Sequence, residues 1–348
     1  MINRILGIFS HDIGIDLGTA NTLVYVLGRG ILIREPSVVT IHKKTKEIIA
    51  VGSEAKRMLG KTPNNIEALR PLRDGVISDF YATQKMIEYF IKNVHNIPSR
   101  FPKIPRPRVV IGVPSGVTSV ERKAVIDAAL SAGARKAYLI EEPMAAAIGA
   151  GLPIQDPVGT MIVDMGGGTS EIAVISLGGI VINKSLRIAG DEMDVAIVDY
   201  ARSKYNLLIG ERTAEEIKFS IGNVIESETE NDSEEKVFLR GRDLKSGLPR
   251  AIEIQPSEIR EAIKVPVMTI INAVKDAIED TPPELVPDII SSGITLAGGT
   301  SLLRGLDKLM EQELHVKIHI AKDPLICVVR GCGKVLEDLD LLEKVKIL

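Results

Sequence analysis

The chain has 348 residues, of which 45% are hydrophobic and 26% are charged, a composition typical of a globular protein. This length exceeds the roughly 250 to 300 residues at which a single hydrophobic core stops growing, so we expect two domains. The 43 basic and 46 acidic side chains leave a formal charge of -3, and a chain without a strongly basic domain is not expected to bind nucleic acid.

The N-terminal segment Met1–Phe9 is predicted to be amphipathic. Ile2, Ile5, Leu6 and Phe9 follow the i, i+3, i+4, i+7 spacing of one helix face. Such a face can lie in a membrane surface, whereas a frayed terminus or an added strand would place the same residues differently. The sequence shows no secretion signal and no apolar run of the roughly 20 residues that span a bilayer. We therefore expect a protein that is neither inserted nor exported.

The first pair of strands is expected at Ile13–Asp16 and Thr22–Leu27, joined by a turn that contains Gly18. This turn suits phosphate, because small or absent side chains let consecutive backbone N–H groups approach anionic oxygens. Asp16 is a candidate for holding Mg²⁺ through water. A single motif of this kind also fits an ordinary hairpin.

Strands and helices alternate in the next part of the chain. We expect a small insertion at 34–73, a proline-rich linker at Pro98–Pro107, a strand at Arg108–Val113, a helix at Val120–Leu130 and a strand at Tyr138–Ile140. This alternation predicts an α/β protein with buried, partly parallel sheets.

Two adjacent carboxylates, Glu141 and Glu142, precede Pro143, which suits the first turn of a helix that continues through Met144–Ile148. Carboxylates at a helix start often only favour the helix dipole. At the edge of a phosphate cleft, a carboxylate also orients a water for attack on a γ-phosphate. The run Ala145–Ala147 reflects helix propensity or lets this helix pack closely against a partner.

A second hairpin repeats the pattern of the first. Its strands are expected at Met161–Asp164 and Ile172–Ile175, on either side of the turn Gly166–Thr169. In both copies an Asp ends the first strand, a glycine follows two residues later and a hydroxyl comes soon after, which suggests two halves of related topology. Two such turns facing each other would clamp a polyphosphate. The chain has no G-x-x-x-x-G-K-[ST] motif, so the predicted site is not a P-loop.

The later part of the chain adds weaker features. A second insertion is expected at 184–247, with an acidic loop at Glu226–Lys236. The glycines of Leu296–Ser301 follow an apolar strand and either approach a nucleotide or form a tight strand-to-helix turn. His315 and His319 alternate with apolar residues and are expected at an exposed strand edge rather than in a metal site.

The order of two phosphate hairpins, a linking helix and a late Gly-Gly turn resembles the nucleotide fold shared by actin, sugar kinases and the large heat-shock chaperones. Nine segments over nearly the whole chain resemble the MreB family of bacterial actins: IDLGTANTLVYV, RPLRDGVISDF, VIGVPSGVTSVERKAV, IEEPMAAAIGAGLP, VDMGGGTSEIAVISLGGI, RIAGDEMD, LIGERTAEEIK, TPPELVPDII and LAGGTSLLRGL. The combination of EEPMAAAIG and TPPELVPDI is highly specific to that family.

This resemblance implies an actin-like ATPase fold. Two duplicated, ribonuclease-H-like α/β domains would flank a nucleotide cleft, each with a smaller inserted subdomain. The expected boundaries are 1–147 with 320–348 for domain I and 148–319 for domain II. The inserted subdomains would be 34–73 and 184–247.

The resemblance also implies a function. The family member would be an ATPase that polymerises into paired antiparallel protofilaments on the inner face of the cytoplasmic membrane. There it would maintain rod shape by guiding peptidoglycan synthesis, together with RodZ and MreC. The two cysteines, Cys327 and Cys332, are too few for a disulfide scaffold and lack the spacing of a zinc site, which fits a reducing cytosol.

Residue by residue, the resemblance implies that Asp16 and Asp164 attend Mg²⁺ and that Glu142 is catalytic. The residues implied in ATP binding belong to the two turns, to a segment beside the ribose and adenine, and to the late Gly-Gly turn: Thr19, Ala20, Asn21, Gly166, Gly167, Gly168, Thr169, Glu215, Glu216, Ile217, Lys218, Gly298, Gly299, Thr300 and Ser301. Thr300 departs from the many relatives that have a third glycine, and its Cβ would alter the approach of the nucleotide.

Two other functions fit the same fold. A small-molecule kinase would use the same two turns but needs a general base that faces a second pocket, and the sequence offers no candidate. A chaperone would need a peptide-binding domain after Leu348, and none is expected.

Overall fold

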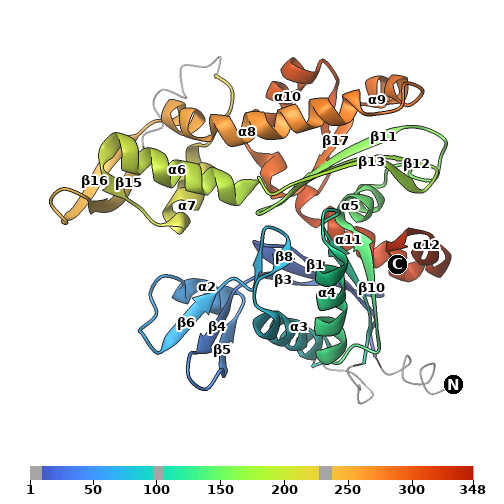
Figure 1. Cartoon of the computed structure of the whole chain (residues 1–348), viewed down its shortest axis with the longest axis horizontal. Helices are drawn as coiled ribbons and strands as arrows, with labels where there is room; N and C mark the ends of the chain where they lie inside the picture. Colours follow the sequence, from blue (N-terminus) through green and yellow to red (C-terminus); the bar gives the residue numbers. More distant parts are fainter. Residues whose placement is uncertain (1–9, 97–105, 227–236, 348) are drawn as a thin grey trace.

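The computed structural model describes residues 10–96, 106–226 and 237–347. Two large sheets lie in two lobes, one above the other in the view of Figure 1. The blue and teal lobe contains the first hairpin, and the green to orange lobe contains the second. The actin-like α/β architecture predicted from the sequence is therefore present, while the chain positions of the domain boundaries remain a prediction.

The first sheet has six strands in the order β19-β10-β9-β1-β2-β3. Their bounds are β1 Ile13–Leu17, β2 Asn21–Val26, β3 Gly30–Pro36, β9 Arg108–Val113, β10 Lys136–Glu141 and β19 Lys346–Ile347. Strands β1, β2 and β3 form an antiparallel meander, and β9 and β10 continue from β1 in parallel. The predicted first hairpin is thus confirmed.

The second sheet repeats this arrangement with five strands in the order β13-β12-β11-β17-β18. Their bounds are β11 Thr160–Met165, β12 Ser170–Ser176, β13 Gly179–Leu186, β17 Ile294–Ala297 and β18 Ile318–Ile320. Here too an antiparallel meander is followed by two parallel strands. The shared topology confirms the duplication that the two hairpin motifs predicted.

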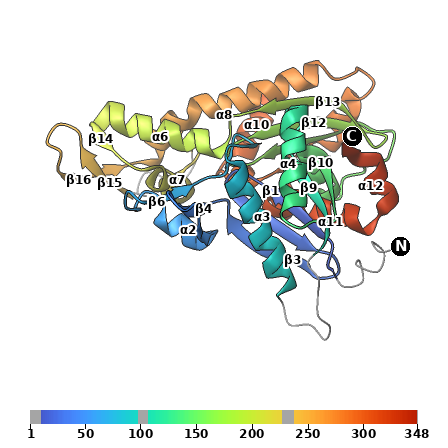
Figure 2. The ribbon, with the colours of Figure 1, turned by 60° about the horizontal axis from the view of Figure 1, so that its bottom comes forward.

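Helices pack beside each sheet and bury its apolar side chains. In the first lobe, α3 (Phe80–His95) and α4 (Ser119–Ser131) lie side by side (Figure 2). In the second lobe, α6 (Gly190–Tyr205) lies along α8 (Pro256–Glu279). This lobe also contains α7 Glu211–Ile221, α9 Val286–Ser292, η2 Gly299–Leu302 and α10 Leu306–Leu314, and η3 Pro324–Ile326 follows β18.

Smaller sheets extend from each lobe near the predicted insertions, whose bounds stay a prediction; the sheets continue past those bounds, to Ile77 and to Ile254. Next to the first sheet lie β4 Val39–His42, β5 Ile48–Val51, α2 Ser53–Met58, β6 Ile66–Leu69, β7 Leu72–Arg73 and β8 Val76–Ile77. Next to the second lie β14 Leu207–Leu208, β15 Val237–Asp243 and β16 Pro249–Ile254.

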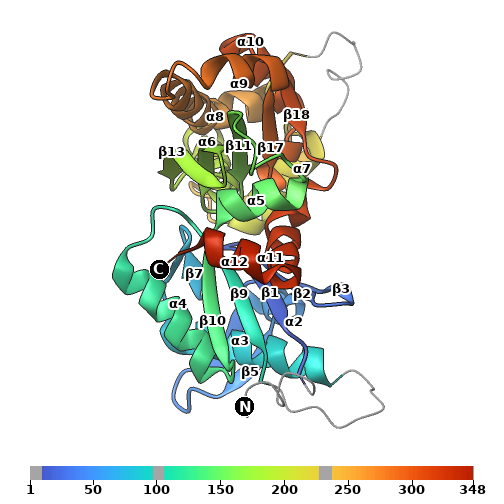
Figure 3. The same cartoon turned by 90° about the vertical axis from the view of Figure 1, so that its right-hand side faces the viewer.

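Two helices, α5 (Glu142–Ala150) and α11 (Cys327–Glu337), lie between the lobes, with α12 (Leu339–Val345) beside them (Figure 3). Their backbones approach so closely that a Cβ at Gly331 would stand 1.9 Å from the Ala145 carbonyl oxygen. A Cβ at Gly149 would stand 1.8 Å from the Cys327 carbonyl oxygen. The small side chains of α5 therefore serve close packing at the junction, one of the two roles that the sequence left open.

The predictions for the two histidines, the N-terminal segment, the linker and the acidic loop have different outcomes. His315 is not on a strand edge: it ends α10 in a left-handed conformation with φ of 55°, and only His319 lies on β18. The predicted membrane residues Ile2, Ile5, Leu6 and Phe9 lie outside the described residues, as do most of the proline-rich linker and the acidic loop. Among the described residues, no helix has the length and apolar character needed to cross a membrane.

Candidate functional site

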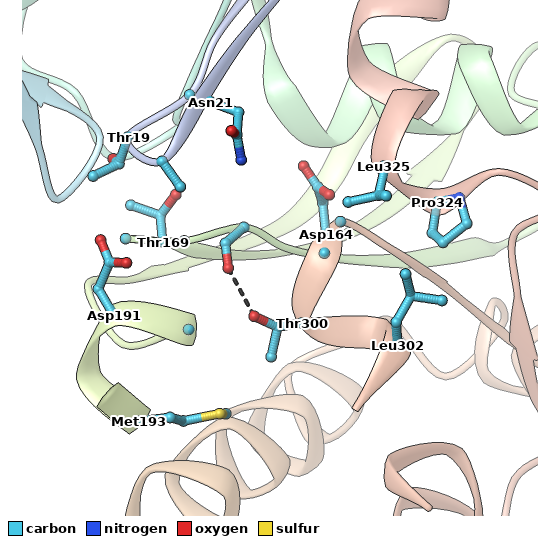
Figure 4. A pocket seen from close by; sticks show the side chains of 18 of the residues that line it. Thr19, Asn21, Asp164, Thr169, Asp191, Met193, Thr300, Leu302, Pro324 and Leu325 are labelled. Carbon is cyan, nitrogen blue, oxygen red and sulfur yellow. Dashed lines mark hydrogen bonds between the residues drawn. The ribbon is translucent and has the colours of Figure 1, made fainter. Parts of the chain in front are cut away.

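The turns of the two hairpins face each other at the junction of the lobes. A Cβ added at Gly167 would lie 2.7 Å from the Ala20 Cβ, and one at Gly168 would lie 2.8 Å from the Thr19 Oγ1. Figure 4 shows Thr19 and Thr169 on these two opposed turns. A side chain at Gly167 or Gly168 would therefore displace the first turn.

Each turn is held by a hydroxyl from another part of the chain. The Ser37 Oγ donates to the Gly18 carbonyl at 2.6 Å, and the Thr300 Oγ1 donates to the Gly166 carbonyl at 2.8 Å (Figure 4). A third glycine at position 300 would lack this hydrogen bond. Thr300 consequently fixes the second turn in place while its side chain lines the same cavity.

A cavity of about 290 Å³ lies between the turns and continues toward α7 and η2. It is lined by most of the residues that the sequence singled out: Asp16, Thr19, Ala20, Asn21, Glu142, Asp164, Gly166, Gly167, Gly168, Thr169, Glu215, Lys218, Gly298, Gly299 and Thr300. These residues come from both hairpins, from α5, from α7 and from the turn after β17. The fold thus gathers at one cavity groups that lie far apart along the chain.

Three predicted contact residues do not line the cavity, and these predictions are corrected. On α7, Glu215 and Lys218 share the face toward the cavity because they are three residues apart. Glu216 instead lies on the surface, where it pairs with Arg212 at 2.9 Å, and Ile217 is buried in the core of the second lobe. Ser301 is fully buried, and its Oγ donates to the Gly298 carbonyl.

Three carboxylates, those of Asp16, Glu142 and Asp164, line one part of the cavity. Burial raises the pKa of Asp16 to about 7. The pKa values of Glu142 and Asp164 are raised well above their usual range, mainly by burial and then by repulsion from neighbouring carboxylates. Such a group of like charges favours a cation at this end of the cavity.

The two adjacent glutamates before Pro143 point to different surroundings. Glu142 lines the cavity and is 8% exposed. Glu141 accepts a hydrogen bond from the Ser115 Oγ at 2.7 Å and does not line the cavity. The structure therefore separates two residues that the spacing alone could not distinguish.

Lys218 is held by partners on α6. Its Nζ lies 2.8 Å from the Asp194 Oδ1 and donates to the Gly190 carbonyl at 2.6 Å. Burial raises the pKa of Asp194 to about 6, although the charge of Lys218 acts in the opposite direction. The Lys218 ammonium group therefore lies at the cavity wall, where it already contacts the Asp194 carboxylate and the Gly190 carbonyl.

Several lining residues were not singled out from the sequence. Gly75 donates its N–H to the Thr19 Oγ1 at 3.1 Å and has φ of 75°. The Asp74-Gly75 pair between two short strands is a recognisable hairpin turn, but nothing local places it against the first phosphate turn. Apolar residues missed in the same way include Leu23, Met193, Phe219, Leu302, Leu303, Leu325 and Val328.

Two ion pairs join the lobes at the edge of this cavity. The Lys56 Nζ lies 3.0 Å from the Glu215 carboxylate, and the Arg70 guanidinium lies 3.5 Å from the Asp191 carboxylate. In each pair the cation comes from the first insertion, and the acid lines the cavity on the second lobe.

Comparison with known proteins decides the family. The family model described as MreB/Mbl protein matches residues 10–344. The chain belongs to the MreB/Mbl family. It is 51% identical over 345 residues to the cell shape-determining protein MreB of Escherichia coli strain K12, covering 98% of this chain and 97% of that protein.

Further relatives extend this match to the fold. The chain is 48% identical over 339 residues to the cell shape-determining protein Mbl of Bacillus subtilis strain 168, covering 97% of this chain and 99% of that protein. The crystal structure of MreB5 of Spiroplasma citri bound to AMPPNP superimposes with a TM-score of 0.87 at 38% identity, covering 95% and 97% of the two chains. The MreB/Mbl chain described here therefore has the actin-like fold that its motifs predicted.

Proposed function

We propose that this chain binds ATP with Mg²⁺ in the cavity between the two hairpin turns and hydrolyses it. The observation that carries the proposal is the pair of turns, because all the residues of Thr19–Asn21 and Gly166–Thr169 line one cavity. Backbone amides in turns of this kind bind phosphate oxygens. The AMPPNP-bound structure of Spiroplasma citri MreB5 supports the choice of an adenine nucleotide.

The carboxylates at one end of the cavity fit a divalent cation. Asp16, Glu142 and Asp164 all have pKa values raised by burial, so a cation would offset the repulsion between their charged forms. No three His, Cys, Asp or Glu side chains in the described parts of the chain are arranged to hold a metal by themselves. Water and phosphate oxygens would complete the coordination, as is usual for Mg²⁺. When bound, Mg²⁺ neutralises charge on the phosphate oxygens.

Glu142 is the candidate for orienting the attacking water. The two turns account for binding of the phosphates, and Glu142 is the buried carboxylate that α5 contributes to the same cavity. Phosphoryl transfer depends mostly on positioning and electrostatics, so loss of this group should act on rate more than on binding.

Glu142→Ala should bind ATP as the wild type does and release phosphate roughly 10² to 10⁴ times more slowly. Phosphate release and fluorescent-nucleotide binding measure the two quantities separately. Glu279→Ala, which removes an exposed carboxylate on α8, is the matched control. Wild-type phosphate release from Glu142→Ala would contradict the assignment.

Assembly into actin-like filaments is the second part of the proposal. The relatives in E. coli and B. subtilis are named as cell shape-determining proteins. We infer that this chain maintains rod shape through ATP-dependent, paired antiparallel filaments that organise peptidoglycan synthesis with RodZ and MreC. Sedimentation should show an ATP-dependent pellet above a critical concentration, and Glu142→Ala filaments should persist longer. A monomer at every concentration, with and without lipid, would refute assembly.

Attachment to the inner face of the cytoplasmic membrane is the third part. It rests on the apolar spacing of Ile2, Ile5, Leu6 and Phe9. Deletion of residues 1–9 should lower co-sedimentation with anionic liposomes. Unchanged co-sedimentation would place the membrane contact elsewhere in the chain.

A further inference from the structure

A network of hydrogen bonds joins the two lobes beside the proposed catalytic glutamate. Its centre is Glu171 on β12, whose side chain is fully buried. One carboxylate oxygen of Glu171 accepts from the Ser115 N–H at 3.1 Å, and the other accepts from the Ser185 Oγ at 2.6 Å. Ser115 follows β9 in the first lobe, while Glu171 and Ser185 belong to the second. The carboxylate therefore bridges the lobes.

The same serine continues the network to the start of α5. The Ser115 Oγ donates to the Glu141 Oε2 at 2.7 Å, and the Asn183 Nδ2 reaches that oxygen at 3.4 Å. Glu141 is the N-cap residue of α5, yet its side chain makes no capping hydrogen bond to the helix. Instead, the Glu141 carboxylate accepts the hydrogen bonds from Ser115 and Asn183.

Glu142 is consequently held from both sides. The side chain of the preceding residue is bonded to Ser115, and the following residue is Pro143, whose ring restricts the backbone. A fixed backbone on each side leaves Glu142 little freedom except rotation of its own side chain, which lines the nucleotide cavity.

Burying a carboxylate in this network costs desolvation free energy. Burial raises the pKa of Glu171, and the charge of Glu171 in turn raises the pKa of Glu142. Apolar residues of similar volume often stabilise such a position at least as well as buried charged groups. The buried Glu171 carboxylate is therefore better explained by the positions of the groups that it holds than by a gain in folding stability.

We propose that Ser115, Glu141 and Glu171 are positioning residues that keep Glu142 aimed at the γ-phosphate when the two lobes are in their bridged arrangement. This inference rests on the proposed ATPase function. Ser115 is the link on which the arrangement depends, because its N–H and its hydroxyl bond two different carboxylates from the two lobes.

The test compares two substitutions at the half-buried Ser115. Ser115→Ala removes the hydrogen bond to Glu141, whereas Ser115→Thr keeps a hydroxyl in the same place. We expect Ser115→Ala to lower kcat for phosphate release by roughly 10-fold to 100-fold, since small misplacements of catalytic groups have effects of this size. The affinity for ATP and the Tm should stay at wild-type values, and Ser115→Thr should restore kcat.

Two further variants complete the experiment. Glu171→Gln, which keeps the shape but loses one acceptor, should lower kcat in the same way as Ser115→Ala. Ser203→Ala removes an exposed hydroxyl bonded to the Tyr200 carbonyl at 3.2 Å and should behave as wild type.

Each alternative result overturns the inference. Wild-type kcat in Ser115→Ala would show that the hydrogen bond between Ser115 and Glu141 does not position Glu142, and a parallel loss of ATP affinity or Tm would show a general structural role. Failure of Ser115→Thr to restore kcat would show that the hydroxyl is not the cause. Failure of the proposed function is distinguishable, because in that case the wild-type protein itself would release no phosphate from ATP.

Discussion

The two hairpin turns join equivalent strands of the two sheets, but they differ in the side chains that they bring to the cavity. The first turn has one glycine and carries the side chains of Thr19 and Ala20, whereas the second has three consecutive glycines. A Cβ at Gly167 or Gly168 would collide with those side chains of the first turn. The glycines of the second turn thus leave room for the first turn as well as for phosphate, and the two turns form one packed unit.

The turns also differ in how they are anchored. The carbonyl of Gly18 is held by Ser37, which is 19 residues away in the chain, while that of Gly166 is held by Thr300, which is 134 residues away. The first turn is therefore supported within its own sheet and the second by a distant segment. The two halves therefore share their strands and a hydroxyl that binds the turn carbonyl. That hydroxyl comes from a different part of the fold in each half.

The largest expected effect comes from filling the space between the turns. Gly167→Ala places a Cβ 2.7 Å from the Ala20 Cβ and should weaken ATP binding by roughly 100-fold, since overpacking costs about 3 kcal/mol at its upper range. Fluorescent-nucleotide titration measures the change.

The double variant Gly167→Ala with Ala20→Gly moves the methyl group from one turn to the other and should recover most of the affinity. Gly179→Ala in β13 is the control, because its Cβ would stand 3.8 Å from the nearest atom, the Ser176 carbonyl oxygen, and Gly179 does not line the cavity. A double variant as weak as Gly167→Ala alone would contradict direct packing of the turns.

The next effect compares the two aspartates that end the matching strands. Asp16→Asn and Asp164→Asn should each lower the Mg²⁺-dependent affinity for ATP by roughly 10-fold to 100-fold, because each removes one charge from a site that holds the cation through water. Titrations with Mg²⁺ and with a chelator isolate this contribution. Asp199→Asn, on the exposed side of α6, should have no effect. A loss confined to one aspartate would show that the halves do not share the cation.

A smaller effect concerns the two anchors. Ser37→Ala and Thr300→Ala each remove one hydrogen bond to a turn carbonyl and should reduce ATP affinity by about 5-fold, which corresponds to about 1 kcal/mol. Thr300→Ser keeps the hydroxyl and should bind ATP as the wild type does. If Thr300→Ala instead bound ATP more tightly, the threonine would be an obstruction rather than a support.

The smallest expected effect concerns the ion pair between Asp194 and Lys218, which lies in the second half of the molecule. The pKa of Asp194 is raised to about 6 in the folded chain, so folding takes up a proton between its usual range near 3.8 and about 6. The contribution of Asp194 to stability therefore falls as pH rises through this window. In nucleotide-free protein, Asp194→Asn should lessen the decline in Tm between pH 4 and pH 6. An unchanged slope would place the titration elsewhere.

Much of the site was predictable because it rests on local rules. The strand, turn and glycine patterns around Asp16 and Asp164 predict both hairpins, and Pro143 correctly marks the start of α5. Helix periodicity would also have excluded Glu216 and Ile217 once the inward face of α7 was known. That face is set by packing against α6 and β15, which the local sequence does not describe.

Short-range physical chemistry accounts for the strands, the turns and the duplication, since backbone conformation and apolar spacing act over a few residues. Only the assembled lobes decide which groups meet. Glu141 and Glu142 have the same chemistry and adjacent positions, but one bonds Ser115 and the other lines the cavity. Likewise, Thr300 reaches Gly166, and the glycines of one turn accommodate Thr19 and Ala20 of the other. These contacts span long stretches of chain and exist only because packing of α5 and α11 brings the two sheets together.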